Sequence, residues 1–428
     1  MDESNGLRLW LTETKSRGMA LGVEATHRAL NALKLGPPSY ETVHVAGSNG
    51  KGTTVATLSA ALTASGIANL SFTSPHLVRV EERVRLNGVP VSRDEFDRAL
   101  ATVKAVEDSL NQPLTFFEVT FLVASVVARR HDVRVVLLET GLGGRLDATR
   151  AASANVSVVT ALALEHTDVL GDTLTDIARE KAAIARPFQP LIARLPEDTE
   201  VQLAIETLAQ RVGNPALGEP SGPALLQWVS MEENDGAFME AKRLSKAVWP
   251  HLKATTGADF PSFEALHWPA RMQRVPSPSK VGMTYLLDGA HNPSGMAKSC
   301  EHLIATLGES GEPWGLLLGS SPQTDMAAFL APLVSLTNAN PPSVVLVSVP
   351  QGGRYPGIDG PVMADYLRQW GVQVHRITAT PDEAVAWFET QPTDISTVLS
   401  IGSLYMQGNV LETLGATDDD ALTVRAKV

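Results

Sequence analysis

The sequence predicts an α/β protein with two domains, the first of them built on a mostly parallel sheet. Apolar β-branched runs alternate with segments whose apolar residues recur at helical spacing, which is the pattern of β-α-β units. The chain has 428 residues, more than one hydrophobic core usually supports. A segment rich in proline and serine at 274–280 is typical of a linker. We therefore expect domains at 1–273 and 274–428.

The first domain begins its alternation with a strand at 41–45 and a helix at 55–62. Parallel strands need a crossover between them, and the later helical segments supply it. Thr173 or Asp172 is expected to cap the last of these helices. The further expected segments are the strand 70–72, the helices 93–110 and 115–130, the strands 133–138 and 156–159, and the helix 173–184.

Residues 187–269 have weaker periodicity, so only a helix at 236–252 is expected there. Beyond the linker the alternation resumes and predicts a second, smaller α/β domain. The tail after Gly415 is acidic and then basic, and we expect it to be disordered. The expected segments are strands at 284–287, 314–318, 343–349, 372–375 and 397–400, with helices that begin at 293, 326, 361 and 381 and a last helix after the final strand.

Composition and charge exclude several classes of protein. A net charge of −12 argues against a general nucleic-acid binder, which needs a basic surface to displace counterions from phosphates. No apolar run is long enough to span a bilayer and no leader is visible, so we expect a cytoplasmic protein. The single cysteine, Cys300, leaves no internal disulfide. An anionic ligand must meet local positive charge, for which Lys51, Arg145, Arg271 and bound metal are candidates.

A glycine-rich turn between the first strand and the first helix is the main candidate for a ligand site. Small residues there let backbone N–H groups converge on phosphate oxygens at a helix N-terminus. Lys51 can reach the outer phosphates, and Thr53 or Thr54 can approach a metal. Val45 and Gly52 depart from the strict Walker pattern, so a turn that binds nothing is the alternative. The expected phosphate-binding residues are Gly47, Ser48, Asn49, Gly50, Lys51, Gly52 and Thr53.

Ser74, Glu139 and His166 each follow an apolar strand of the first domain. The carboxyl ends of parallel strands share one edge of a sheet, so these residues should lie near Lys51. A hydroxyl, a carboxylate and an imidazole there can hold Mg²⁺ beside a nucleotide. For His166 a hydrogen-bonded structural role is an equal alternative. A carboxylate at Glu139 would be costly in a core unless it is paired or bound to metal.

Lys181 lies within the expected helix 173–184, where composition alone favours a solvated lysine. In the second domain, Asp288 and His291 follow the strand 284–287. Polar strand ends in both domains predict a cleft between them, and closure of that cleft would exclude water from a reactive intermediate.

Together these motifs resemble those of the folylpolyglutamate synthase/dihydrofolate synthase family of the Mur ligase superfamily. The resemblance extends from the first helix to about residue 414 and is weakest in the middle. It implies an N-terminal Mur-ligase-type P-loop ATPase domain and a C-terminal Rossmann-like α/β domain. The segments that carry it are 46–52, 74–77 with 82–85, 116–118, 141–149, 166–168, 180–182, 288–293 and 402–405.

The resemblance implies an ATP-dependent amide ligase, in which a substrate carboxylate attacks the γ-phosphate and the amine of L-glutamate then displaces phosphate. It implies two Mg²⁺ sites, held by Ser74, Glu139 and His166 and by a carbamylated Lys181. The expected catalytic groups are Lys51, Glu139, His166 and Lys181. The other implied nucleotide contacts are Asn234 to adenine, Arg271 and His291 to the phosphates, and Asp288 to the ribose.

Several positions depart from the family pattern, so the reaction type is predicted more firmly than the substrate. The family usually has an apolar residue at Thr140, asparagine at Arg150, aspartate at Glu165, His-Gln at Ser230-Met231, glycine at Ala270 and lysine at Thr324.

Two other functions stay open. One is a Mur-ligase-type enzyme that joins a non-folate carboxylic acid to an amino acid in a secondary pathway, and the other is a nucleotide-binding relative without catalysis. A plain Walker-type NTPase would leave the second domain unexplained. We expect small-molecule partners, a pterin- or folate-like acid and L-glutamate, with no nucleic acid or membrane, and a monomeric chain.

Overall fold

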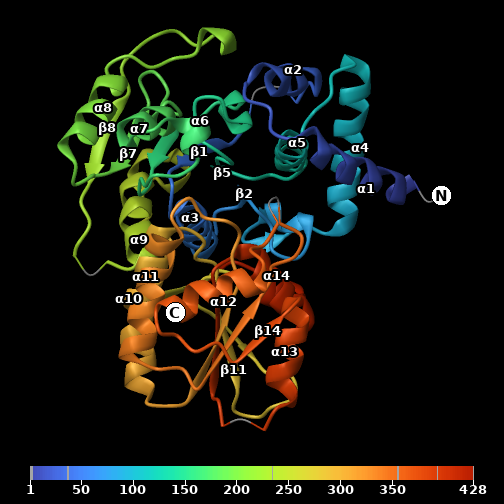
Figure 1. Ribbon diagram of the computed structural model, residues 1–428. Helices are drawn as coiled ribbons and strands as arrows, with labels where there is room; N and C mark the ends of the chain where they lie inside the picture. Colours follow the sequence, from blue (N-terminus) through green and yellow to red (C-terminus); the bar gives the residue numbers. More distant parts are fainter. Residues whose placement is uncertain (1–2, 36–37, 234, 354–355, 393, 428) are drawn as a thin grey trace. The chain divides into compact units, whose positions relative to one another are not determined.

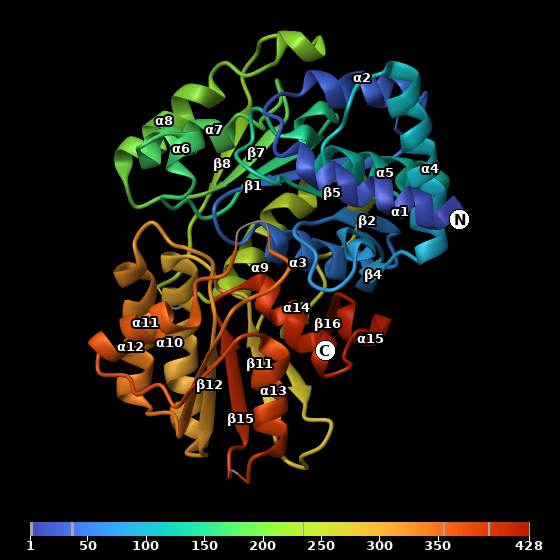
Figure 2. The same ribbon diagram turned by 45° about the vertical axis from the view of Figure 1, so that its right-hand side comes forward.

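The computed structural model describes residues 3–35, 38–233, 235–353, 356–392 and 394–427, which fold into two compact units (Figures 1 and 2). Unit 1 is formed by Met1–His76, Glu81–Leu266 and Val424–Val428, and unit 2 by Leu77–Val80 and His267–Thr423. Each unit has its own sheet with helices on both faces, so the predicted α/β class is confirmed. The expected domain boundary after residue 273 falls within strand β10.

Unit 1 contains a sheet with the strand order β4-β3-β2-β5-β1-β6-β7-β8. The strands from β2 to β8 in this order pair in parallel, whereas β3 pairs antiparallel with both β2 and β4. The carboxyl ends of β2, β5, β1 and β6 are therefore neighbours at one edge. The strands are β1 (Glu41–Ala46), β2 (Asn69–Phe72), β3 (Val84–Leu86), β4 (Val89–Pro90), β5 (Val135–Glu139), β6 (Val156–Val159), β7 (Pro190–Arg194) and β8 (Leu225–Val229).

Helices cover both faces of this sheet. On one face α3 packs with α9 over apolar residues of β1, β5 and β6. On the other, α7 and α8 pack together near β6 and β7, and α5 covers β2. The helices are α1 (Glu3–Glu13), α2 (Glu24–Ala32), α3 (Lys51–Ala64), α4 (Arg93–Leu110), α5 (Phe116–Arg130), α6 (Thr167–Leu170), α7 (Leu174–Ala182), α8 (Thr199–Ala209) and α9 (Ala237–Val248), with 3₁₀ turns η1 (Thr14–Arg17), η2 (Val80–Arg83), η3 (Ala148–Ala151), η4 (Pro215–Leu217), η5 (Trp249–His251) and η6 (Lys253–Thr255).

Two helix ends in unit 1 follow from the local sequence. The Thr173 hydroxyl accepts the backbone N–H of Asp176, which confirms Thr173 as the N-cap of α7. The expected helix 236–252 ends as an α-helix at Val248 and continues as the 3₁₀ turn η5. Pro250 lies in that turn and has no backbone N–H to donate to an α-helical hydrogen bond.

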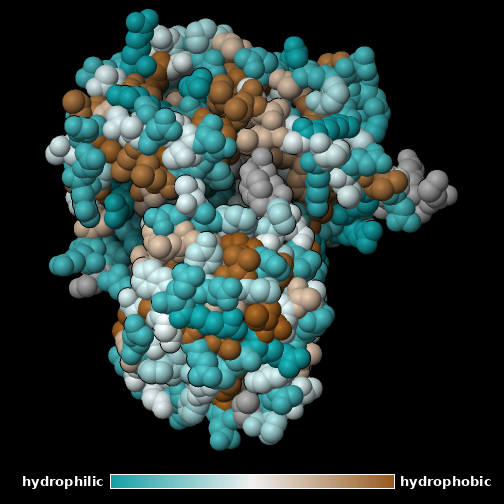
Figure 3. Space-filling view, viewed as in Figure 1, coloured by the Kyte–Doolittle hydropathy of each residue, from teal (hydrophilic) through white to brown (hydrophobic). Residues whose placement is uncertain are grey.

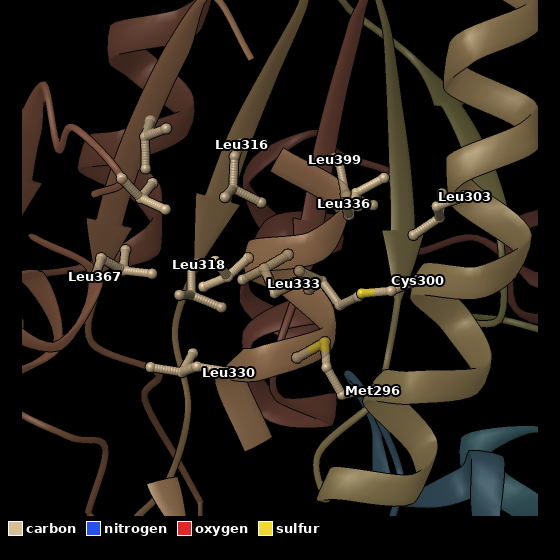
Figure 4. Packing of buried hydrophobic residues seen from close by; sticks show 14 of the residues in the cluster. Met296, Cys300, Leu303, Leu316, Leu318, Leu330, Leu333, Leu336, Leu367 and Leu399 are labelled. Carbon is tan, nitrogen blue, oxygen red and sulfur yellow. The ribbon is translucent and has the colours of Figure 1, made fainter. Parts of the chain in front are cut away.

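Unit 2 has the strand order β10-β11-β15-β12-β13-β14, with β10 antiparallel to β11 and the other pairs parallel. One face packs against α10, α11 and α12, where Met296, Cys300 and Leu303 of α10 meet leucines of β12 and α11 (Figure 4). The other face packs against α13 and α14. The elements are β10 (Gln273–Pro276), β11 (Thr284–Asp288), β12 (Trp314–Leu318), β13 (Val344–Ser348), β14 (Arg376–Thr378), β15 (Thr397–Ile401), α10 (Pro293–Ser310), α11 (Met326–Ala339), α12 (Gly360–Gln369), α13 (Pro381–Thr390), α14 (Leu404–Thr413) and α15 (Asp419–Leu422).

Two local predictions in the C-terminal part are wrong. The strand expected at 372–375 is β14, four residues later, because the His375 ring accepts the backbone N–H of Val345 and pairing begins only at Arg376. The tail is ordered: after α15, strand β16 (Arg425–Lys427) pairs with β9 (Ala265–His267). Ala426 also packs against the apolar cluster of α3, so burial offsets the polar composition that predicted disorder.

None of the described helices combines the length and the apolar composition that a membrane crossing requires. On the face of the molecule in Figure 3, apolar patches are interspersed among hydrophilic residues.

Candidate active site

The loop that follows β1 is shaped by two glycines and held against the end of β6. Gly47 (φ 151°) and Gly50 (φ 85°) have backbone conformations that favour glycine. The hydroxyl of Thr160, directly after β6, donates to the Asn49 carbonyl at 2.7 Å. The loop then enters the N-terminus of α3, where no side chain caps the helix and its first N–H groups and dipole suit an anion.

The other predicted residues of this loop lie close by. The Ser48 hydroxyl donates to the Ala163 carbonyl at 3.0 Å. Gly52 and Thr53 lie in the first turn of α3. The hydroxyl of Thr54, the other threonine expected near a metal, is buried and donates to the Gly50 carbonyl at 2.9 Å.

Two lysine side chains converge on one carbonyl of this loop. Lys51 Nζ donates to the carbonyl oxygens of Gly47 at 2.8 Å and Ser48 at 3.2 Å. Lys181 Nζ, from α7, donates to the same Gly47 oxygen at 3.0 Å. Lys181 is 1% exposed, so the solvated lysine that composition favoured is wrong. The fold thus gathers two cationic groups at the glycine turn.

Glu165 supplies the negative charge beside these two lysines. Its Oε1 accepts a hydrogen bond from Lys181 Nζ at 2.7 Å. Burial by itself would raise the pKa of Glu165, but the Lys51 and Lys181 ammonium groups outweigh burial and lower the pKa to about 2. Burial and the neighbouring Lys51 lower the pKa of Lys181 to about 8, against the opposing effect of Glu165. The Glu165 carboxylate is therefore ionised at neutral pH.

Glu139 and Ser74 meet at the ends of adjacent strands. Glu139 is the last residue of β5, is 5% exposed and pairs in register with Val45 of β1. Its Oε2 accepts the backbone N–H of Ser74, after β2, at 3.0 Å. Because β2, β5 and β1 are neighbours, Ser74 and Glu139 lie at the same sheet edge as the glycine turn.

His166 follows Glu165 and is the N-cap residue of α6, with a left-handed backbone (φ 45°) and an exposed side chain. Partial burial lowers its pKa, the Lys181 and Lys51 charges lower it further, and Glu165 and Asp168 oppose them. The imidazole is therefore within electrostatic range of both lysines.

The glycine-rich turn after Glu139 positions the helix that carries Lys181. A Cβ atom on Gly144 would lie 2.8 Å from the carbonyl oxygens of both Glu180 and Lys181, so only glycine allows this close packing. The buried Asp147 carboxylate accepts the backbone N–H of Gly141 at 2.8 Å. Burial raises the pKa of Asp147, and its hydrogen bonds oppose that rise. Asp147 thus stabilises the turn through a hydrogen bond, and the turn packs directly against α7.

An aromatic ring of unit 1 lies beside cationic groups. The Arg83 guanidinium carbon is 4.9 Å from the centroid of the Phe116 ring, and Lys15 Nζ is 5.2 Å from it. The His76 ring lies 6.2 Å from the same ring, and its Nδ1 accepts from Arg83 Nε at 2.9 Å. Burial, with Arg83 and Lys15, lowers the pKa of His76 to about 3, so the ring is neutral. Such a cluster suits an aromatic or carboxylate ligand.

In unit 2, the predicted residues Asp288, His291 and Arg271 lie together at the end of β11. The buried Asp288 carboxylate accepts the backbone N–H of Met272 at 3.2 Å. His291 Nδ1 is 2.9 Å from the Gly289 carbonyl oxygen. A Cβ atom on Gly289 would lie 2.1 Å from Arg271 Nη1, so the guanidinium passes directly over this glycine.

The predicted adenine contact, Asn234, lies outside the described residues. Ser230 and Met231, which precede it, line a cavity of about 330 Å³ after β7 and β8, together with Arg194 and Pro196.

Two of the departures from the family pattern have a clear structural setting. Arg150 is 2% exposed and forms an ion pair with the partly buried Glu219, with 2.8 Å between Nη1 and Oε1. Ala270 has a left-handed backbone (φ 55°), the region that favours the glycine usual in the family. Thr140 stands where the family usually has an apolar residue, and its buried hydroxyl has no hydrogen-bond partner among the described residues.

Sequence reasoning missed Thr160 and treated Glu165 only as a departure. Both follow β6, as His166 does, so the strand-end argument that identified His166 could have identified them. The role of Glu219 could not be predicted from the sequence, because its loop has no hydrophobic periodicity and its partners Arg150 and Arg186 are distant in sequence.

No family model matches the chain. It is 38% identical over 233 residues to the dihydrofolate synthase/folylpolyglutamate synthase of Escherichia coli (strain K12), which covers 54% of this chain and 53% of that protein. A bifunctional folylpolyglutamate synthase/dihydropteroate synthase of Halobacterium salinarum is 29% identical, and the match covers 96% of this chain and 52% of that protein. The chain thus spans about half the length of each of these two relatives.

Solved structures match over nearly the whole chain. The E. coli FolC structure in complex with DHPP and ADP is 26% identical, has a TM-score of 0.73 and covers 96% of this chain and 98% of that one. The bifunctional folylpolyglutamate synthase/dihydrofolate synthase of Yersinia pestis, complexed with AMPPNP and Mn ion, is 27% identical with a TM-score of 0.75 and the same coverage. The ordered motifs, the relatives and the shared Mur ligase fold agree: the chain is similar in sequence and in fold to members of the folylpolyglutamate synthase/dihydrofolate synthase family.

Proposed function

We propose that this protein is an ATP-dependent amide ligase that joins L-glutamate to dihydropteroate, to a reduced folate, or to both. The observation that carries the proposal is the convergence of Lys51 and Lys181 on the Gly47 carbonyl, beside the strand ends that hold Glu139 and Ser74. Two cations and a carboxylate at one glycine turn suit phosphoryl transfer, which depends on charge stabilisation and positioning. Relatives with the same fold are described in complex with DHPP, ADP and AMPPNP.

Each step balances in atoms and charge. A carboxylate oxygen of the acid attacks the γ-phosphorus of ATP, the bond to the β-phosphate oxygen breaks, and ADP leaves. The neutral α-amino nitrogen of glutamate then attacks the acyl carbon, phosphate leaves, and the nitrogen loses a proton. Lys51 and the N–H groups at the start of α3 would hold the phosphates through both steps, and positioning the reactants would supply much of the rate.

The residues at this edge fit Mg²⁺. Magnesium in proteins is usually held by one or two carboxylates together with phosphates and water, rather than by a complete protein cage. The described residues contain no group of three or more His, Cys, Asp or Glu side chains that could hold a metal. Glu139, Ser74 and His166 would hold the ions, with Lys181 as a carbamate for the second. Bound Mg²⁺ would neutralise charge on the transferred phosphoryl group.

The cluster around Phe116 is proposed as the site for the ring system of the acid. Phe116 offers an aromatic face, and Arg83 and Lys15 offer positive charge for a carboxylate. His76 stays neutral, and because its Nδ1 accepts from Arg83, its Nε2–H can donate a hydrogen bond to the acid. An aryl acid bound there would lie close to Ser74, two residues before His76 in the chain.

The roles of unit 2 remain proposals. We propose that Arg271 and His291 contact phosphates and that Asp288 and Asn234 contact the nucleoside. The predicted cleft between the domains, the monomeric state and the cytoplasmic location likewise remain predictions.

The proposal is tested with purified protein, ATP and Mg²⁺, with dihydropteroate or tetrahydrofolate as the acid. We expect phosphate release that requires both an acid and L-glutamate, and a product heavier than the acid by one glutamyl residue in mass spectrometry. Phosphate release with neither acid would contradict the folate assignment. Release with a different acid would favour the non-folate ligase, and nucleotide binding without release for a broad panel of acids would favour the non-catalytic relative.

Replacing Gly47 with alanine is expected to weaken ADP binding by at least about tenfold. The added Cβ would lie 1.9 Å from Thr160 Oγ1, at a φ of 151° that side chains rarely adopt, and strain of this kind costs about 1–3 kcal/mol. Titration calorimetry with MgADP measures the effect. The matched control is Gly66→Ala, at φ 70° with no atom within 4 Å of the new Cβ. Binding by Gly47→Ala within twofold of the wild type would show that the loop does not hold the phosphates.

A further inference from the structure

The turn that carries Arg271 in unit 2 has a backbone conformation that its own residues disfavour. Ala270 and Met272, on either side of Arg271, both have left-handed backbones, with φ of 55° and 48°. Residues other than glycine adopt this region at a cost, so the surrounding structure must hold them there. Arg271 depends on the turn directly, because its Nη1 donates to the Ala270 carbonyl at 3.1 Å and passes over Gly289.

Hydrogen bonds on both sides of Arg271 hold this turn. The Asp288 carboxylate accepts the Met272 N–H at 3.2 Å. On the other side, Gln273 Oε1 accepts the Ala270 N–H at 2.9 Å. Ala270 is fully buried and Gln273 is 5% exposed. The loss of the Gln273 amide would therefore leave a buried N–H group without an acceptor, which is costly.

The Gln273 amide is itself held by the C-terminal tail. Its Nε2 donates to the Ala421 carbonyl of α15 at 3.1 Å, and His267 Nε2 is 3.2 Å from the same oxygen. Leu422, which follows Ala421, is fully buried in an apolar cluster of unit 2. Residue 421 lies beyond residue 414, where the resemblance to the family ends, so no family motif predicts this contact. Both ends of the Gln273 amide are thus fixed by backbone groups.

We propose that Gln273 is a positioning residue that links the Ala421 carbonyl to the Ala270 N–H and thereby places the Arg271 guanidinium. The inference rests on the proposed phosphate contact of Arg271 and deepens it, because it names the group that holds Arg271 in place. Gln273 would act through the turn, without a contact of its own to the nucleotide. Because Ala270 is left-handed where the family usually has glycine, this chain should depend on Gln273 more than a relative with glycine does.

The test measures MgADP binding by titration calorimetry for the wild type, Gln273→Leu, Arg271→Ala and the double variant. We expect Gln273→Leu to weaken binding by at least about fivefold, because leucine cannot accept the Ala270 N–H. Added to Arg271→Ala, the same change should weaken binding by less than about twofold further, because a residue that acts through Arg271 then has nothing left to position. The KM for ATP should rise while the KM for the acid stays within about twofold of the wild type, a split that general unfolding would not produce.

A second variant keeps the test decisive if Gln273→Leu folds poorly. Glycine adopts a φ of 55° without a Cβ penalty, so Ala270→Gly combined with Gln273→Leu should bind MgADP within about threefold of the wild type. The matched control is Gln407→Leu, at a fully buried glutamine of α14 whose Nε2 donates to the Ser403 carbonyl. This control should change MgADP affinity by less than about twofold.

Binding by folded Gln273→Leu within about twofold of the wild type would overturn the inference, as would full additivity with Arg271→Ala. Wild-type binding by Arg271→Ala would overturn the phosphate contact of Arg271 and the inference with it. A wild type that binds no MgADP would instead overturn the proposed function. Hydrogen exchange of segment 268–273 then still decides whether Gln273 holds the turn, because Gln273→Leu should accelerate that exchange by at least about tenfold in the ligand-free protein.

Discussion

Replacing Lys181 with alanine is expected to lower ligation by at least about 10³-fold, on the scale of losing one charged group from a phosphoryl-transfer site. Lys181 is 1% exposed and its Nζ donates to the Gly47 carbonyl, so its loss removes a buried group of α7 that contacts the phosphate loop. If the lysine acts as a carbamate, the variant loses an anion that would hold the second metal. Phosphate release with ATP, acid and L-glutamate measures the effect.

Chemical rescue separates the carbamate from the plain cation. In the Lys181→Ala cavity, added formate or acetate should restore part of the activity if a carboxylate-like group is needed there. Carbon-13 NMR with labelled bicarbonate should show a carbamate resonance in the wild type that is missing in the variant. The control is Arg179→Ala, on the same helix with a side chain 57% exposed, which should stay near wild-type activity. Near-normal activity of Lys181→Ala without added carboxylate would refute a catalytic role for this residue.

The sequence predicted the layered fold because β-α-β alternation is a local signal. The helix 93–110 has the predicted bounds, and the strand 156–159 is β6. The elements missed between 187 and 235 have weak local patterns: β8 is an edge strand with partly exposed residues, so no apolar run marks it. The tail was mispredicted because β16 is stabilised by pairing with β9, a contact distant in sequence.

The sequence predicted those residues of the candidate site that lie at the carboxyl ends of strands. Lys51 was identified from the glycine-rich turn that carries it. Ser74, Glu139 and His166 were identified because each follows an apolar run, and parallel strands bring such ends to one edge. Lys181 is on a helix, where composition favours exposure, and only the resemblance indicated its importance. Its pairing with Glu165 depends on how closely α7 packs against the glycine turn, which is a tertiary property.

Replacing Glu219 with glutamine is expected to destabilise unit 1 by about 3–5 kcal/mol, the cost of breaking a buried ion pair from one side. Glu219 is the carboxylate shared by Arg150 and Arg186, whose side chains are 2% and 5% exposed. Glutamine would leave both guanidinium groups buried without a counter-charge. The calorimetric unfolding transition should move down by on the order of 10 °C. The control is Glu200→Gln, an exposed position at the start of α8 where only a small helix-dipole effect is lost.

Arg150→Asn, which installs the residue usual in the family, provides the second half of a double-mutant cycle. Alone it should cost less than Glu219→Gln, because Glu219 keeps Arg186 at 3.1 Å. Combined with Glu219→Gln it should cost less than the sum of the two single changes, because one of the two uncompensated cations is gone. Arg186 would still donate to the Arg150 and Ala152 backbone carbonyls, which limits the remaining penalty. Strict additivity, or a Glu219→Gln protein that unfolds within about 2 °C of the wild type, would show that solvent rather than Glu219 compensates these charges.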